Sequence, residues 1–441
     1  MSNQAHTSDD PGAHDAEGNE LVLAGYDENT DVDPLAARPV PRISIQVFCE
    51  DSDTADAIQL VAEDRRLSKA HLTVHMGGAA AAVGQYKDSP TPNLIVVEST
   101  LDRNDMLQEL DQLAECCDAG TKVIVIGHMN DVELYRELLR RGVSEYVVTP
   151  IKPLAFMESI SNLYNDPDAQ PVGQVIAFVG AKGGVGSSTI CHNVAWSLSN
   201  QVDASIVVAD FDLAFGTTGL DFNQDPIQGI AEALQTPERL DDQLLDRLLT
   251  KCTDNLSIFA APVVLDRDYD MSPDSCEMVI DVVRQNVPYV LVDVPHGWNP
   301  WSKSLLLQAD EVVITATPDL ANLRNAKNLF DFLKQTRNND RPPHLLLNMV
   351  NTPKRPEISI NEFCKGVDAA AAAVLEFDCE TFGTAANNGQ MIEELNRKAK
   401  CVQSFHDLAM MLTHRSKSKS AKASKYGKSA LAPLFETLRG R

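Results

Sequence analysis

The sequence predicts an α/β protein with two doubly wound parallel-sheet domains and a disordered tail at each end. Short apolar runs of strand length alternate with helical spacing along most of the chain, a pattern typical of parallel sheets covered by helices. A polar stretch with two prolines, within residues 164–173, predicts a linker between domains of residues 42–163 and 174–412. An acidic arm, residues 1–41, and a basic tail of low complexity, residues 413–441, flank these domains.

Composition excludes several classes of protein. The 441 residues carry a formal net charge of −25, which argues against coating of nucleic acid, because that function needs a basic surface. The nine cysteines are scattered and contain no CxxC pair, so they fit a reducing cytosol better than a disulfide framework. No apolar run is long enough to span a bilayer, and the polar N-terminus does not resemble a secretory signal. We therefore expect a soluble, cytoplasmic protein.

The acidic arm has almost no basic residues and cannot bury enough apolar surface to offset its ordering entropy. It is either an acidic docking tail or a solvated leader without a specific partner. From Arg42 onward the sequence shows the patterns of strands and helices. The predicted strands of the first domain are residues 43–48, 94–97, 123–126 and 146–148, with helical patterns between them.

This order of elements, together with residues 142–150 (GVSEYVVTP), resembles a response-regulator receiver domain. The resemblance places Glu98 where a receiver has its phosphorylated aspartate, Gly127 where it has a hydroxyl, and Thr149 where it has a lysine. Of the receiver chemistry only the acidic pair Glu50 and Asp51 remains. Glu98 could imitate a permanently charged state or be an ordinary surface carboxylate. We predict a pseudo-receiver that serves as an interaction or targeting module.

The second domain opens on residues 175–189 (VIAFVGAKGGVGSST), an apolar strand, a glycine-rich turn and the start of a helix. Helix N-termini offer unpaired N–H groups and the positive end of a dipole, which suit phosphate. Gly183, Gly184 and Gly186 let the backbone approach an anion closely. The alternative is a tight strand-to-helix turn that binds no ligand.

In this loop Ser187 occupies the slot of the usual P-loop lysine, Ser188 occupies that of the magnesium-binding hydroxyl, and Lys182 lies near the start. This arrangement resembles the deviant Walker A motif of the MinD/ParA ATPases. The resemblance implies that the loop holds ATP through Gly183, Gly184, Val185, Gly186, Ser187, Ser188 and Thr189.

Two further strands end in acids. Residues 205–209 lead into Asp210 and Asp212, and residues 288–292 lead into Asp293, which looks like Walker B. Ligands of such sheets lie beyond the carboxyl ends of the strands, where carboxylates can hold Mg²⁺ and orient water. Asp210 and Asp212 alone could also be solvated turn residues. His296, between Pro295 and Gly297, is interpreted as a switch-loop residue without proton chemistry.

Residues 311–315 and 344–348 predict further strands, and residues 256–260 could pair with them. The MinD/ParA resemblance makes Asn348 an adenine contact, and a capping or turn role is the alternative.

Four segments, residues 293–296, 309–327, 353–359 and 382–391, look like the CpaE/TadZ pilus-assembly proteins. In that family a pseudo-receiver precedes a MinD-like domain, and the likeness covers roughly residues 42–410. It implies a cytoplasmic factor that localises at a cell pole near the inner membrane. Its partners would be polar proteins and the Flp-type (tight adherence) pilus or secretion machinery, which it helps to position.

The same resemblance implies a homodimer that sandwiches two ATP molecules. Lys182 would reach the phosphates of the other subunit, Ser188, Asp210 and Asp293 would hold Mg²⁺, and Asp212 would place the attacking water. Loss of the lysine beside the γ-phosphate removes an attraction of about 4 kcal/mol at ~4 Å. We therefore expect weak nucleotide affinity in the monomer and slow hydrolysis.

The basic tail ends in an amphipathic segment with Leu431, Leu434, Phe435 and Leu438 at helical spacing. Peripheral membrane contact and docking on a protein partner are both open. Two other functions compete with the leading one: a non-hydrolysing scaffold, and a ParA-type ATPase that partitions DNA. The acidic balance disfavours nucleic acid as a partner.

Overall fold

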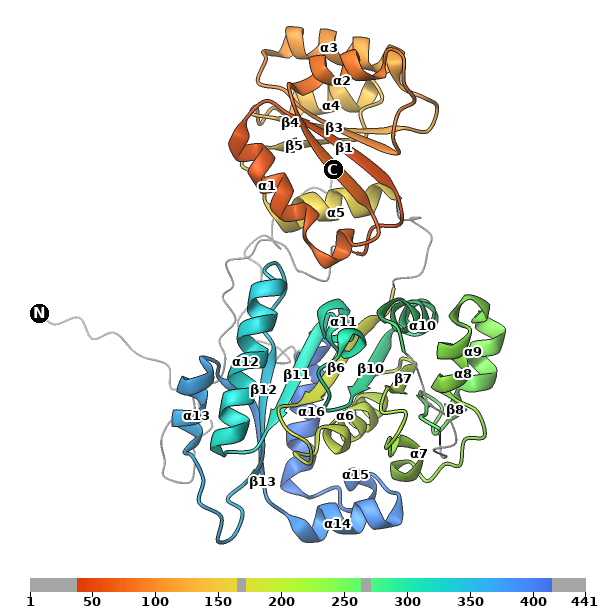
Figure 1. Ribbon diagram of the computed structural model, residues 1–441, viewed down its shortest axis with the longest axis vertical. Coiled ribbons are helices and arrows are strands. Elements are labelled where there is room, and N and C mark those ends of the chain that lie inside the picture. Colours follow the sequence, from red (N-terminus) through yellow and green to blue (C-terminus); the bar gives the residue numbers. More distant parts are fainter. Residues whose placement is uncertain (1–37, 165–171, 263–270, 415–441) are drawn as a thin grey trace, which may run out of the picture.

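A computed structural model describes residues 38–164, 172–262 and 271–414. The predicted α/β fold class is confirmed, because the chain forms two separate sheets covered by helices. We call the described residues 38–164 the N-terminal domain and those from 172 to 414 the C-terminal domain; Figure 1 shows the first above the second. Most of the predicted acidic arm, linker and basic tail lies outside the described residues.

The sheet of the N-terminal domain has five parallel strands in the order β2-β1-β3-β4-β5. The strands are β1 (Ser44–Cys49), β2 (His71–Met76), β3 (Leu94–Glu98), β4 (Lys122–Gly127) and β5 (Glu145–Val148). Strand β2 was not predicted, because its side chains are half-buried and its sequence HLTVHM lacks an apolar run.

Helices cover both faces of this sheet. They are α1 (Ser52–Ala62), α2 (Gly78–Tyr86), α3 (Arg103–Cys116), α4 (Val132–Arg140), α5 (Pro153–Tyr164) and the short η1 (Arg65–Leu67). The pair α1 and α5 packs on one face and α2, α3 and α4 on the other. Side chains of Asp51, Asp102 and Asp131 cap the first turns of α1, α3 and α4 by accepting from backbone N–H groups. Because both faces are covered, the central strands β3 and β4 are largely apolar.

The sheet of the C-terminal domain has eight strands in the order β13-β12-β11-β6-β10-β7-β9-β8. They are β6 (Gln174–Gly180), β7 (Ile206–Asp210), β8 (Thr250–Lys251), β9 (Leu256–Phe259), β10 (Tyr289–Val294), β11 (Glu311–Ala316), β12 (His344–Val350) and β13 (Ala371–Glu376). All neighbours pair in parallel except the two-residue edge strand β8, which is antiparallel to β9. Neither edge strand, β8 nor β13, was predicted; β13 consists largely of alanine, which has little strand propensity.

The helices of the C-terminal domain begin with α6 (Ser187–Gln201), which follows the glycine-rich loop. The others are α7 (Thr218–Asp221), α8 (Ile230–Gln235), η2 (Pro237–Arg239), α9 (Asp242–Leu248), α10 (Pro273–Asn286), α11 (Pro300–Gln308), α12 (Leu320–Thr336), α13 (Ile360–Val367), α14 (Cys379–Asn388), α15 (Ile392–Leu395) and α16 (Lys400–Leu412). One face of the sheet packs against α6 and α16, and the other against α10, α11 and α12. In the parts of the chain that the structure describes, no helix has the length and apolarity to cross a bilayer.

The second sheet has two functionally distinct edges. Its parallel strands β6, β10 and β11 start beside the N-terminal domain and run away from it (Figure 1). Their carboxyl ends, with the loops that follow, therefore lie at the edge remote from the N-terminal domain. This remote edge holds the glycine-rich loop and the acids predicted from the sequence.

Candidate functional site

The glycine-rich loop joins the end of β6 at Gly180 to the start of α6 at Ser187. Two of its glycines, Gly184 and Gly186, have left-handed backbone angles, with φ of 79° and 87°. A Cβ atom on Gly186 would lie 2.7 Å from Nδ2 of Asn348. A side chain there would thus be strained by its backbone and would displace a neighbour.

The loop presents a set of unpaired donors. Among the described residues, none accepts a hydrogen bond from the backbone N–H groups of residues 183–189. The side-chain oxygen of Ser187 is buried and also has no partner. Buried or converging donors of this kind need an acceptor, and the start of α6 adds the positive end of its dipole. The loop is therefore built to hold an anion such as a phosphate group.

Three side chains hold the loop from outside by donating to its carbonyl groups. Nδ1 of His296 lies 3.1 Å from the oxygen of Gly180, Nδ2 of Asn325 lies 2.9 Å from that of Ala181, and Nδ2 of Asn348 lies 2.8 Å from that of Val185. With the carbonyl groups engaged outward, the N–H groups are left for a ligand. The role of Asn325 was not predicted, although it lies inside the segment 309–327 that the sequence singled out.

Asn348 is buried, and both of its side-chain groups are engaged. Its Nδ2 donates to the loop, and its Oδ1 accepts from the N–H of Met349 at 2.8 Å. This geometry corresponds to the turn role considered for Asn348. An adenine contact would require this side chain to release one of the two bonds.

Asp293 lies on β10 beside the loop and is 2% exposed. Burial and the charge of Asp210 raise its pKa to about 7, while His192 and a hydrogen bond with the Ser188 side chain act against this rise. The pairing register places Asp293 opposite Asp210, the last residue of β7. The predicted metal residues Ser188, Asp210 and Asp293 are thus brought together by three neighbouring elements.

Asp210 and Asp212 differ in environment. Asp210 is 0% exposed, so its interpretation as a solvated turn residue is wrong. Its Oδ1 accepts from the N–H of Asp212, and its Oδ2 accepts from the hydroxyl of Thr218 at 2.7 Å. Asp212 is partly exposed and accepts from the N–H of Phe215, yet its charge still helps to raise the pKa of Asp293. It lies at the mouth of the site, whereas Asp210 lies at its base.

His192, which was not predicted, connects these acids. It is fully buried on α6, with Nδ1 at 2.7 Å from Oδ2 of Asp221 and Nε2 at 3.0 Å from the hydroxyl of Thr218. Burial lowers its pKa, but the bond to Asp221 and the charges of Asp293 and Asp210 raise it overall. The sequence signal was present: a histidine in a helix, between the apolar residues Ile190 and Val194.

Lys182 is exposed and forms no ion pair with any described residue. Its charge reaches Asp319, after the end of β11: burial raises the pKa of Asp319, but hydrogen bonds from Asn322 and Thr317 and the charge of Lys182 bring it below its ordinary value. Lys182 is therefore available to a group outside its own loop.

The donor set suits a magnesium–phosphate group better than a bare metal. Within residues 38–164, 172–262 and 271–414, no three His, Cys, Asp or Glu side chains are arranged to hold a metal ion by themselves. Mg²⁺ usually takes one or two carboxylates together with phosphate oxygens and water. Asp293 and Ser188 are suited to bind the metal, and the unpaired loop amides are suited to bind the phosphate group.

At the carboxyl ends of the strands in the N-terminal domain, the converging donors already have an acceptor. Glu98 is 0% exposed, so its interpretation as a surface carboxylate is wrong. Its Oε2 accepts from the N–H groups of Glu50 and Asp51 at 2.7 and 2.9 Å, and its Oε1 accepts from the hydroxyl of Thr54 at 2.7 Å. His128 lies 3.5 Å from Oε1 on the remaining side. The carboxylate thus occupies the donors that a phosphoryl group would need.

Comparisons with known proteins address the C-terminal domain directly. Residues 173–345 match the family model described as AAA domain. The septum site-determining protein MinD of Bacillus subtilis is 23% identical over 235 residues, which cover 50% of this chain and 82% of that protein.

Two solved structures are also similar. A ParA family ATPase from Chlorobium tepidum is 24% identical, with a TM-score of 0.49, over 54% of this chain and 98% of that one. The pilus assembly protein CpaE from Caulobacter crescentus is 47% identical, with a TM-score of 0.29, over 29% of this chain and 98% of that one. By these comparisons, residues 173–345 match the AAA domain model, and about half of the chain is similar to the septum site-determining protein MinD.

Proposed function

We propose that the protein is an ATP- and Mg²⁺-binding, weakly hydrolysing localisation factor, switched by nucleotide-dependent dimerisation, that positions Flp-type pilus assembly machinery. The observation that carries the nucleotide part is the run of N–H groups at residues 183–189 without an acceptor among the described residues, beside the hydrogen-bonded pair Ser188 and Asp293. A triphosphate supplies the acceptors that this loop lacks, and its metal supplies the charge that Asp293 and Asp210 need.

Each site residue has a role in this proposal. Residues 183–189 hold the phosphates, Ser188 and Asp293 bind Mg²⁺, and Asp210 acts on the metal from the base of the site. Asp212, at the mouth, orients the attacking water. His192 and Thr218 keep Asp210 in place by hydrogen bonds. Bound Mg²⁺ would neutralise phosphate charge.

A second copy of the chain is the proposed partner at the nucleotide edge. Large apolar side chains stand exposed shortly after β7, β10 and β11: Phe215 is 75% exposed, Trp298 57% and Leu320, at the start of α12, 75%. Exposed apolar groups around a site mark an interaction surface. Lys182, which is exposed and unpaired, would reach the phosphates across this interface.

The pilus role is supported by the four segments that resemble the CpaE/TadZ proteins, and the CpaE identity reported above is consistent with it. In this proposal the N-terminal domain is a pseudo-receiver that targets the protein, because its former phosphoryl site is filled by Glu98. The protein would act in the cytoplasm at a pole near the inner membrane, with polar proteins and the pilus machinery as partners.

Two variants test the dimer. Lys182→Ala should abolish the ATP-dependent rise in mass seen by light scattering, because the charge that crosses the interface is lost. Lys251→Ala, on the edge strand β8 and 64% exposed, is the matched control and should dimerise normally. If Lys182→Ala dimerises with ATP as well as the wild type does, the trans-acting lysine is wrong.

Ser187→Lys tests why affinity should be weak. A lysine in this slot restores an attraction to the γ-phosphate, of which water and the loop amides already replace part, so ATP affinity should rise by about tenfold. Calorimetric titration with and without Mg²⁺ measures this directly. Unchanged affinity would mean that the slot does not face the nucleotide.

A non-hydrolysing scaffold is the second candidate, and the substitution of serine for the P-loop lysine favours it. Steady-state phosphate release separates the two functions. Turnover that Asp212→Asn abolishes without loss of ATP binding supports the weak ATPase. Absence of turnover in the wild-type dimer supports the scaffold.

A further inference from the structure

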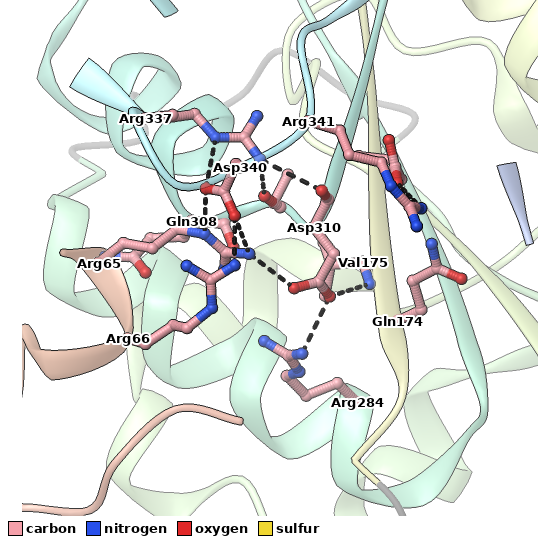
Figure 2. Close-up of polar contacts among 12 residues, drawn as sticks. Arg65, Arg66, Gln174, Val175, Arg284, Gln308, Asp310, Arg337, Asp340 and Arg341 are labelled. Carbon is pink, nitrogen blue, oxygen red and sulfur yellow. Dashed lines mark hydrogen bonds and ion pairs between the residues drawn. The ribbon is translucent and has the colours of Figure 1, made fainter. Parts of the chain in front are cut away.

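The two domains meet through a cluster of buried ion pairs at the amino ends of the second sheet (Figure 2). Arg65, in η1 of the N-terminal domain, donates to Asp340 at 2.8 Å, to Asp310 at 3.0 Å and to the carbonyl oxygen of Gln308 at 2.8 Å. All three acceptors belong to the C-terminal domain. Its neighbour Arg66 bonds Asp340 and, within its own domain, Asp64.

These charges are almost entirely removed from water. The side chains of Arg65 and Asp310 are 10% and 9% exposed, that of Arg66 is 1% exposed and that of Asp340 is 3% exposed. Burial raises the pKa of Asp340, but the charges of Arg65 and Arg337 hold it well below its ordinary value. Charged groups this deeply buried must be paired. Asp310 and Asp340 also have Arg284 and Arg337 in their own domain, whereas the described partners of the Arg65 side chain all belong to the C-terminal domain.

One carboxylate links the cluster to the strand of the glycine-rich loop. Asp310, just before β11, accepts from Arg65 of the N-terminal domain and from Arg284 of α10 at 3.0 Å. It also accepts from the N–H of Val175, near the start of β6, at 2.8 Å. Strand β6 ends at the glycine-rich loop, so one strand connects the domain contact with the nucleotide edge.

The contact extends beyond the cluster and is closely packed. Lys69 of the N-terminal domain pairs with Asp281 and with Glu277 of α10, and Nδ2 of Asn339 donates to Asp64 at 3.0 Å. A cavity of about 30 Å³ at this junction, lined partly by Val40 and Arg284, has room for a water molecule or two and for nothing larger.

We propose that Arg65 and Arg66 fasten the N-terminal domain permanently to the amino ends of the second sheet, so that the two domains form one rigid unit in every nucleotide state. The N-terminal domain is then a fixed carrier opposite the nucleotide edge. It neither covers the glycine-rich loop nor competes with a second copy of the chain there.

Arg65→Glu is the decisive variant. It places a third carboxylate against Asp310 and Asp340, while the side chain of Arg65 bonds none of the described residues of its own domain. Small-angle X-ray scattering of the nucleotide-free monomer should show a larger radius of gyration. The maximum dimension should also increase, by at most about 25 Å, the reach of the seven residues between Tyr164 and Val172. Circular dichroism should remain that of the wild type.

The matched control is Arg140→Glu, the same charge change on the exposed face of α4, where the arginine side chain is 73% exposed. Its scattering should equal that of the wild type. Scanning calorimetry adds a second measure: the wild type and the control should unfold in one transition, and Arg65→Glu in two. Wild-type scattering by Arg65→Glu, or an extended wild type, would overturn the proposal.

This test needs no nucleotide, so its outcome does not depend on the proposed function. Scattering by an ATP-induced dimer then gives a further check that does rest on the proposed function. The contacts of Arg65 and Arg66 and the glycine-rich loop lie at opposite edges of the second sheet. The dimer should therefore be elongated, with the N-terminal domains at its far ends. A dimer that contacts itself through the N-terminal domains would contradict the fixed arrangement, whereas absence of a dimer would count only against the proposed function.

Discussion

The carboxyl edges of the two sheets carry similar parts but differ in what they leave unpaired. In the N-terminal domain the buried carboxylate of Glu98 accepts from the N–H groups of Glu50 and Asp51, and the edge satisfies itself. In the C-terminal domain the N–H groups of residues 183–189 have no acceptor in the described chain, and the buried carboxylate of Asp293 lies beside them. The N–H donors of the first edge have an acceptor within the protein, and those of the second edge have none among the described residues.

The difference shows that fold and position do not decide whether a site binds anything. Both edges belong to doubly wound parallel sheets, where ligands are usually found. One buried carboxylate at the end of β3 supplies the negative charge that a phosphoryl group would bring. The donors at the first edge are therefore satisfied by one residue of the domain itself, and single substitutions at either edge test the comparison.

The largest effect is expected from Gly186→Ala, which closes the open edge. The new Cβ would meet Nδ2 of Asn348 at 2.7 Å on a backbone with φ of 87°. Strain of about 1–3 kcal/mol should weaken ATP binding by roughly 5- to 150-fold. Gly84→Ala, in α2, is the control: its added Cβ would have no neighbour within 4 Å, and the variant should bind ATP normally. Equal ATP affinity of the two variants, measured by calorimetric titration, would contradict binding of the nucleotide by the glycine-rich loop.

The second-largest effect is expected from protonation of Asp293, because the proton competes with Mg²⁺. Burial and Asp210 raise its pKa to about 7, so below that pH its carboxyl carries a proton that Mg²⁺ must displace. The Mg²⁺-dependent part of nucleotide binding should therefore weaken as pH falls, by about tenfold per unit below pH 7, and level off above it. Titrations from pH 6 to 8 measure this. Asp293→Asn should bind weakly at every pH, and an unchanged slope in that variant would assign the proton to another group.

The smallest effect on binding is expected from Glu98→Gln at the closed edge. An amide nitrogen cannot accept, so at least one donor among Glu50, Asp51 and Thr54 loses its partner. The free energy of unfolding of the N-terminal domain should fall by about 1–3 kcal/mol, with ATP affinity unchanged. Urea denaturation gives the first quantity, and Glu133→Gln on the exposed surface of α4 is the control. A change in ATP affinity with unchanged stability would mean that the two edges communicate.

The sequence alone determined the elements whose signals are local. Apolar runs with helical spacing between them gave the fold class and most central strands, because a buried strand needs apolar residues on both faces. The glycine-rich loop and the acids after β7 and β10 were visible because each depends on neighbours within a few residues. The strands that were missed, β2, β8 and β13, are short, polar or alanine-rich.

Only the tertiary structure decided which polar groups satisfy one another. Glu98 meets the amides of residues 50 and 51, Asn325 meets the loop at Ala181, and Arg65 meets Asp340 across 275 positions of sequence. No spacing or periodicity signals such contacts, because they arise from how sheets and helices bring distant segments together. The hydrogen-bond and charge requirements of buried groups are satisfied in space. That is why the role of Glu98, the support of the glycine-rich loop by Asn325 and the contact of Arg65 between the domains could be recognised only in the folded chain.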